Sequence, residues 1–202
     1  MSELERHKAV AHLASCAAPG RLDRLEDTIP NLVPKPLAVV DAYELLLQSY
    51  LFFGYPQAIE VMRVFAAACR KLGLTPGRNG DSPSLEEMRL RGEARCREIY
   101  HPNFEKLHAN MLAMSPELAE WMLVEGYGKV LSRPVPAKLE REIASITFLA
   151  CSQHPVQLFS HVRGARNLGG DARLLQQIFS EDIFSGNELA LVNETIKDVF
   201  SE

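Results

Sequence analysis

Two ionisable side chains stand inside apolar helical patterns in the C-terminal half of the chain. Glu142 lies in the stretch that begins at Arg141, and His161 lies in the stretch that begins at Pro155. A carboxylate on an apolar helix face has a desolvation cost unless it is paired. A carboxylate and an imidazole that meet can share a proton, which is what general acid–base catalysis requires. We therefore predict Glu142 and His161 as a catalytic pair.

The periods of the apolar residues indicate how this pair could meet. Glu142 lies roughly 60° from the centre of its helical stripe, because a helix turns about 100° per residue. His161 falls between the members of a second stripe. The break at His154-Pro155 is short and predicts an antiparallel hairpin with facing stripes, so we expect a contact, either direct or through one water. The two stripes consist of Leu139, Ile143, Ile146 and Ala150, and of Leu158, Val162, Ala165 and Leu168.

Two further residues of the hairpin carry chemical groups. His154 stands at the break, where it is interpreted as a turn residue and helix cap or as a second proton carrier in the catalytic set. Arg163 points off the apolar stripe; it is either a bidentate ligand of a substrate carboxylate or part of a structural ion pair. His154 and His161 are separated by a turn and lack a carboxylate that would complete a metal triad, so we expect no metal and no other cofactor.

Three motifs in this region occur in the order found in a known family. The run R-E-I-x-x-I-x-x-L-A starts at Arg141, S-H-V-R-G-A-R-N-L-G-G starts at Ser160, and E-G-Y-G-K-V-L-S-R-P starts at Glu125. Together they resemble the carboxymuconolactone decarboxylase family, most strongly over residues 115–170. The resemblance implies an all-α, alkylhydroperoxidase D-like helical bundle. It also implies a lyase that acts on a small carboxylated lactone or a related acid.

The same resemblance suggests substrate-binding residues and an assembly. Tyr127 and Arg133 belong to the decarboxylase-like lead-in, so they join Arg163 as substrate-binding candidates, with loop packing as the alternative role. The family implies a homo-oligomer, a trimer or hexamer. Phe148 lies opposite the first stripe, which suits either a helix covered on both faces or a subunit contact.

The chain departs from the peroxidase branch of that family at two positions. The branch carries a C-x-x-C pair between its glutamate and its histidine, and those cysteine positions fall here on His154 and Gln157. Disulfide-cycling peroxide chemistry needs an attacking thiolate and a resolving thiol. The alternative to a lyase is therefore an oligomeric binding or stress-related protein that kept the fold without the chemistry. An alkylhydroperoxidase-like activity without C-x-x-C, relying on Cys151 or another single cysteine, ranks third.

Composition narrows the class of protein further. The chain has 202 residues, 47% of them hydrophobic, and a net charge of -4. No basic run indicates nucleic acid, because glutamates interleave the arginines of residues 89–97. Four cysteines form neither a zinc pattern nor a disulfide framework, which predicts reduced thiols and a cytoplasmic protein. The N-terminus shows no signal-peptide pattern, and polar residues interrupt the uncharged stretch 143–162, so we expect no membrane segment.

Breaker residues divide the chain into helices and a central loop. We predict an N-terminal helix and connecting arm over residues 1–33, with one short helical turn at 21–26, followed by a single domain over 34–202. Residues 74–83 form a loop between its halves. A helix that starts after Ser115 is predicted to end at Gly126 and Gly128. A helix–glycine–helix turn at Gly54 is weakly echoed at Gly186, which suggests an internal repeat.

Overall fold

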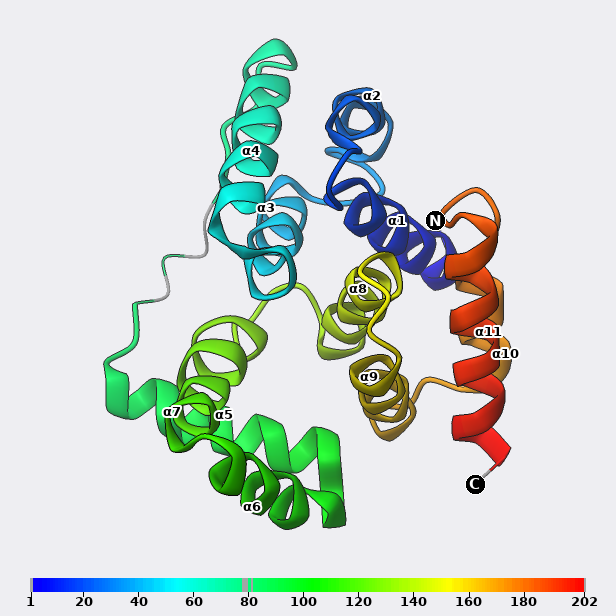
Figure 1. Cartoon of the computed structure of the whole chain (residues 1–202). Coiled ribbons are helices and arrows are strands. Elements are labelled where there is room, and N and C mark those ends of the chain that lie inside the picture. The colour runs from blue at the N-terminus through cyan, green and yellow to red at the C-terminus, as the bar shows by residue number, and fades with distance from the viewer. Residues whose placement is uncertain (1, 78–79, 81, 202) are drawn as a thin grey trace.

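The chain folds as a bundle of helices, with no strand among the described residues. The computed structural model describes residues 2–77, 80 and 82–201. The helices appear in Figure 1. Their bounds are α1 Glu3–Cys16, α2 Leu22–Leu32, α3 Val39–Gln48, α4 Tyr50–Lys71, α5 Leu85–Tyr100, η1 His101–Asn103, α6 Phe104–Met114, α7 Pro116–Trp121, η2 Met122–Leu131, α8 Lys138–Cys151, α9 Pro155–Asn167, α10 Ala172–Ile178 and α11 Gly186–Ser201. The prediction of an all-α fold is confirmed.

Helix α8 lies at the centre of the bundle and positions the predicted site. Every residue from 140 to 150 is buried, and α8 contacts α1, α4, α9 and α11. Figure 1 shows it between α1, α3 and α9. Phe148, on the face away from the Ile143 stripe, packs against the rings of Phe52 and Phe53 at centroid distances of 5.1 and 5.5 Å. Of the two roles considered for Phe148, the structure shows a helix covered on both faces.

Two apolar clusters hold the bundle together. The larger one joins α1 to α4 with α8 to α11, so the N-terminal helix shares the main core. The smaller one consists of residues from α5, α6 and η2, including Cys96, Tyr100 and Tyr127. Figure 1 shows α5, α6 and α7 together on one side of the molecule, apart from α1, α10 and α11. Helix α9 contacts α5 as well as α8, so it lies where the two clusters meet.

Local capping signals mark the starts of α5, α7 and α9, and the last two lie where the sequence predicts them. Ser84 and Glu87 form a capping box at α5, and the hydroxyl of Ser115 accepts from the amide of Leu118 at 3.2 Å at α7. Pro155 begins α9 directly after the turn. Within the loop predicted at 74–83, residues 74–77, 80, 82 and 83 are not helical. Positions 78, 79 and 81 lie outside the described residues.

The predicted glycine turn in the first half is present, although its helices differ in length. Gly54 adopts φ 76° and ψ 171°, and this conformation kinks α4 between Tyr50 and Tyr55. The long helix expected before it is also interrupted, because α3 ends at Gln48. Gly186, the proposed counterpart, begins α11. The two glycines therefore stand in different local structures, and the internal repeat stays a prediction.

The connecting arm predicted within residues 1–33, with only a short helical turn at 21–26, is wrong because a full helix occupies most of it. Residues 22 to 32 form the helix α2, with Pro30 in its last turn. Leu25 and Ile29 are one turn apart and both are fully buried, and α2 contacts α1 and α4. Burial of this face outweighs the helix-breaking tendency of proline, since Pro30 is close to the end of the helix. Only the segment after Val33 remains a connecting arm.

The predicted helix end at Gly126 and Gly128 is also wrong. The helix continues through both glycines as the π-helix η2. A Cβ on Gly128 would lie 1.9 Å from the carbonyl oxygen of Met88, and one on Gly92 would lie 2.0 Å from that of Leu123. These two glycines let the backbones of α5 and η2 touch. Gly128 therefore serves helix packing rather than helix termination.

Candidate functional site

The turn between α8 and α9 brings Glu142 and His161 together. Glu142 is 1% exposed and His161 is 9% exposed. Nδ1 of His161 lies 2.8 Å from Oε2 of Glu142, which is a direct hydrogen bond within a buried pair. The contact expected from the hairpin geometry is therefore present. Its catalytic role stays a prediction.

A glycine on α9 makes room for the carboxylate. Gly164 is buried one turn after His161, and a Cβ added to it would lie 2.7 Å from Oε2 of Glu142. The same Cβ would lie 2.7 Å from Cγ2 of Ile99 on α5. Any larger residue would have to displace one of these buried groups. Gly164 thus fixes how closely α9 approaches both α8 and α5.

The pair is enclosed by aromatic and apolar groups from other elements. The ring of Phe52 on α4 meets the imidazole of His161 edge-on at a centroid distance of 6.1 Å. On the α5 side, the hydroxyl groups of Tyr100 and Tyr127 are 2.8 Å apart. Burial raises the pKa of both phenols, and the charge of Glu142 acts in the same direction. Both tyrosines therefore stay protonated at neutral pH and act as hydrogen-bonding groups.

The chemistry of the imidazole follows from which nitrogen is bonded. With Glu142 ionised, the Nδ1–H group of His161 donates to the carboxylate and the lone pair is on Nε2. Within the described part of the chain, Nε2 makes no hydrogen bond and is not among the buried unsatisfied atoms. A carboxylate that orients an imidazole in this way prepares the other nitrogen for proton transfer. The arrangement suits a single general acid–base group.

His154, predicted as a second proton carrier, is not brought to this pair. It is exposed and precedes α9 without a side-chain capping bond. It lies seven residues before His161 along α9, which corresponds to about 10 Å of helix rise. The interpretation as a turn residue fits this position, while the capping hydrogen bond is absent.

The three predicted substrate-binding residues lie in different surroundings. Tyr127 is buried beside Tyr100, next to the pair. Arg163 is half-buried, with its guanidinium 5.4 Å from the ring centroid of Phe159. Arg133 follows η2, and its Nε and Nη2 donate to Glu44 of α3 at 2.6 and 2.9 Å. The structure thus brings Tyr127 to the pair and places Arg133 in a separate ionic cluster.

Sequence reasoning missed that ionic cluster and the α5 wall of the site. Glu44 on α3 is fully buried and also accepts from Arg141 at 3.1 Å, while Arg141 donates to Gln48 at 3.0 Å. Arg95, on α5, is electrostatically coupled to Glu142, and burial lowers its pKa although Glu98 and Glu142 act to raise it. A glutamate in the apolar run of residues 39–51 was a signal for the cluster, since a buried carboxylate requires a cation.

Cys151 does not have the properties of a peroxide-reactive thiol. Burial, together with the nearby charge of Glu188, raises its pKa to about 12 although Arg21 acts to lower it. A reactive cysteine needs a pKa near or below neutral, because the thiolate is the nucleophile. At neutral pH this thiol is protonated. The raised pKa therefore disfavours single-cysteine peroxidase chemistry at Cys151.

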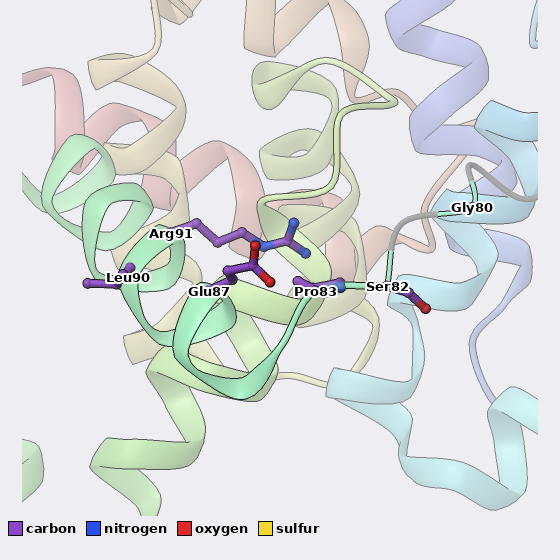
Figure 2. A pocket seen from close by; sticks show the side chains of 6 residues that line it. All are labelled: Gly80, Ser82, Pro83, Glu87, Leu90 and Arg91. Atoms are coloured by element: carbon purple, nitrogen blue, oxygen red, sulfur yellow. The ribbon is translucent and has the colours of Figure 1, made fainter.

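Cavities of the described residues lie away from the pair. Five main cavities are found, and neither Glu142 nor His161 lines any of them. One of these five, of about 520 Å³, lies between α5 and the preceding loop. Figure 2 shows Glu87 and Arg91 of α5 in its wall, facing Pro83.

No group of three or more potential metal ligands occurs among residues 2–77, 80 and 82–201. None of the helices described has the length and apolar character that crossing a bilayer requires. A scan against models of protein families and a search of curated proteins both found no match to this chain.

Proposed function

We propose that the chain is an acid–base enzyme of the decarboxylase type, a lyase that acts on a small carboxylated lactone or a related acid. The observation that carries this proposal is the buried 2.8 Å bond between Glu142 and Nδ1 of His161. It holds the imidazole in one orientation and leaves Nε2 for a reacting proton. The resemblance of residues 115–170 to the carboxymuconolactone decarboxylase family supplies the reaction class.

The proposed reaction uses few groups. The bond between the substrate carboxylate and its carbon breaks, CO2 leaves, and the electron pair remains on the lactone as an enolate. Before the transfer, solvent water protonates Nε2 of His161 to give an imidazolium. His161 then delivers that proton to the carbon, and Nε2 regains its lone pair. An apolar wall such as the ring of Phe52 destabilises the charged carboxylate of the substrate and so favours its loss as CO2. Glu142 stabilises the imidazolium before the proton is transferred. Arg163 is the candidate that orients the substrate carboxylate.

The test is turnover of carboxymuconolactone and its analogues by the purified chain. We expect His161→Ala to lower kcat/KM by about 10²–10⁴-fold, the usual contribution of a positioned acid–base group, and Glu142→Gln to lower it in the same direction. His154→Ala is the matched control, since His154 is exposed and away from the pair. Equal rates for the unaltered chain and His161→Ala would exclude this reaction.

A second function is favoured by one specific observation. Neither Glu142 nor His161 lines any of the five cavities described above, as expected for a homo-oligomeric binding or stress-related protein that uses the pair structurally. Under this alternative, His161→Ala lowers the unfolding temperature and no substrate is turned over. Light scattering of the unaltered chain measures whether a trimer or hexamer forms, and a monomer would contradict the oligomeric part of both proposals.

A further inference from the structure

One of the five cavities lies between α4 and η2. It has a volume of about 400 Å³, and residues of α3 and of the segment that follows η2 complete its walls. Helix α4 belongs to the larger apolar cluster and η2 to the smaller one, so the cavity lies at the seam between the two. Cavities of this size between helices commonly hold small organic molecules. No described residue of α8 or α9 lines it, so it is separate from the site proposed above.

The exposure of the apolar lining residues shows how the cavity is oriented. Ala58 of α4 and Val130 of η2 are 6% and 2% exposed, so they belong to its floor. Tyr55 and Ile59 of α4 are 64% and 62% exposed, so they stand at its opening. Burial of such apolar surface by a ligand is favourable, because it removes the surface from water. The cavity therefore favours a ligand whose apolar body reaches from the floor to the opening.

One wall of the cavity is shaped by the kink in α4. Gly54 has φ 76°, and after this turn the rings of Tyr50 and Tyr55 meet at a centroid distance of 5.3 Å, with their planes inclined by 37°. Met62 lies seven residues after Tyr55 and therefore on the same face of α4. Its flexible thioether side chain adapts to neighbouring shapes and packs well against aromatic rings. The wall thus offers both ring and sulfur contacts to an aromatic ligand.

The charged side chains that line the cavity are already paired. Nε and Nη2 of Arg133 donate to the fully buried Glu44 at 2.6 and 2.9 Å. Nζ of Lys129 donates to Oε2 of Glu125 at 2.9 Å, and the hydroxyl of Tyr50 donates to the same oxygen at 3.1 Å. An anionic ligand would have to compete with these carboxylates, and a cationic one would meet two cations. Either would lose hydration without gaining a new counter-ion from the described lining, which favours a neutral ligand.

We propose that this cavity binds a small, neutral aromatic molecule. Its rings pack between Tyr50, Tyr55 and Met62, and its inner end reaches the floor formed with η2. Bound in this way, it joins the two apolar clusters across their seam and stabilises the folded chain. Because neither Glu142 nor His161 takes part, the inference goes beyond the proposed acid–base reaction and does not depend on it.

Fluorescence titration of the full chain with N-phenyl-1-naphthylamine and 8-anilino-1-naphthalenesulfonate tests this. The two probes share one aromatic body, and only the second carries a charge. We expect the neutral probe to bind at one site per chain and the sulfonate to bind at least about tenfold more weakly, a difference of ~1.4 kcal/mol. Binding of the sulfonate as tightly as the neutral probe, or no saturable binding of the neutral probe at micromolar concentration, would overturn the proposal. His161→Ala should bind the neutral probe unchanged, which separates this result from the fate of the proposed reaction.

A matched pair of variants locates the binding site. Tyr55→Ala removes an exposed ring from the opening and should weaken binding of the neutral probe about fivefold, as expected for one lost aromatic contact. Trp121→Ala removes a ring that is 58% exposed on α7 and lines a different cavity, so it should leave binding unchanged. Weaker binding by Trp121→Ala and unchanged binding by Tyr55→Ala would contradict the assignment.

Light scattering of the same chains separates a ligand from a second copy of the protein at this cavity. An oligomer that Tyr55→Ala dissociates, together with no binding of the neutral probe to the unaltered chain, would mean that a second copy covers the opening. That result would overturn the proposal. An unchanged oligomeric state in Tyr55→Ala, together with its weaker binding of the neutral probe, is the expected outcome.

Discussion

Arg141 and Glu142 are consecutive, both are buried, and they enter two different environments. Arg141 joins Glu44, Arg133 and Gln48, where its two terminal nitrogens both donate. Glu142 meets only His161 by hydrogen bond within the described residues, and the far nitrogen of that ring remains unbonded. The first environment uses charge to hold α3 and the segment after η2 against α8. The second leaves one ring nitrogen available, which is why we assign the chemistry to it.

Removing the central carboxylate of the ionic cluster should have the largest effect. Glu44→Gln keeps the shape but leaves Arg141 and Arg133 without the negative charge that they share. Breaking a buried ion pair from one side costs about 3–5 kcal/mol. Chemical denaturation should therefore show that loss in the free energy of unfolding.

The control for this change is Glu60→Gln on α4. Glu60 pairs with Arg63, whose side chain is 69% exposed, and such a surface pair contributes about 0–1 kcal/mol. If Glu44→Gln and Glu60→Gln lower the free energy of unfolding by similar amounts, the buried ionic cluster does not stabilise the fold more than a surface ion pair does.

A methyl group added at Gly164 tests the other side of α8. Gly164→Ala must push against Oε2 of Glu142 or Cγ2 of Ile99, each 2.7 Å from the new atom. Overpacking of this kind costs about 1–3 kcal/mol. We also expect the imidazole to lose its fixed orientation, which NMR of the His161 ring would detect as a changed tautomer balance.

Gly126→Ala is the matched glycine substitution. No heavy atom lies within 4 Å of a Cβ at Gly126, and the residue is helical, so alanine should change stability by no more than about 1 kcal/mol. If Gly164→Ala is as well tolerated as Gly126→Ala, the close approach of α9 to Glu142 does not constrain the site.

The two regions also differ in how well the sequence predicts them. Glu142 and His161 belong to one helical hairpin, so the 3.6-residue period and the short turn were sufficient to predict their contact. The ionic cluster draws Glu44, Arg133 and Arg141 from three segments, and no local pattern links them. Only the cost of a buried Glu44 indicated that some partner must exist.

The helices that sequence reasoning misjudged have a similar explanation. Pro30 and the glycines of η2 are local helix breakers, and local preference alone predicts no helix through them. In α2, burial of Leu25 and Ile29 outweighs it. In η2, a tertiary contact explains why glycine stands at position 128, because only a residue without Cβ lets the backbones of η2 and α5 meet. This contact can be recognised only when the helix that packs against η2 is known.

The smallest effect concerns Cys96, a buried thiol on the Glu142 side of α8. Burial, and next the charge of Glu142, raise its pKa from 9.0 to about 12. The folded chain therefore holds this proton more tightly than the unfolded chain. The resulting stability is fully present below pH 9 and is lost as the pH rises toward 12, with a slope of at most ~1.4 kcal/mol per pH unit.

The measurement is the free energy of unfolding as a function of alkaline pH in four chains: the unaltered chain and three variants. Cys96→Ala should fall less steeply with pH than the unaltered chain, because it has no thiol to ionise at this position. Glu142→Gln should give an intermediate slope, since it keeps the burial of Cys96 and removes the neighbouring charge. The ionic cluster gives the contrast: Glu44 is not among the groups that perturb Cys96, so Glu44→Gln should lower stability without changing this slope. Identical slopes for the unaltered chain and Cys96→Ala would contradict the raised pKa of Cys96 and the effect of Glu142 on it.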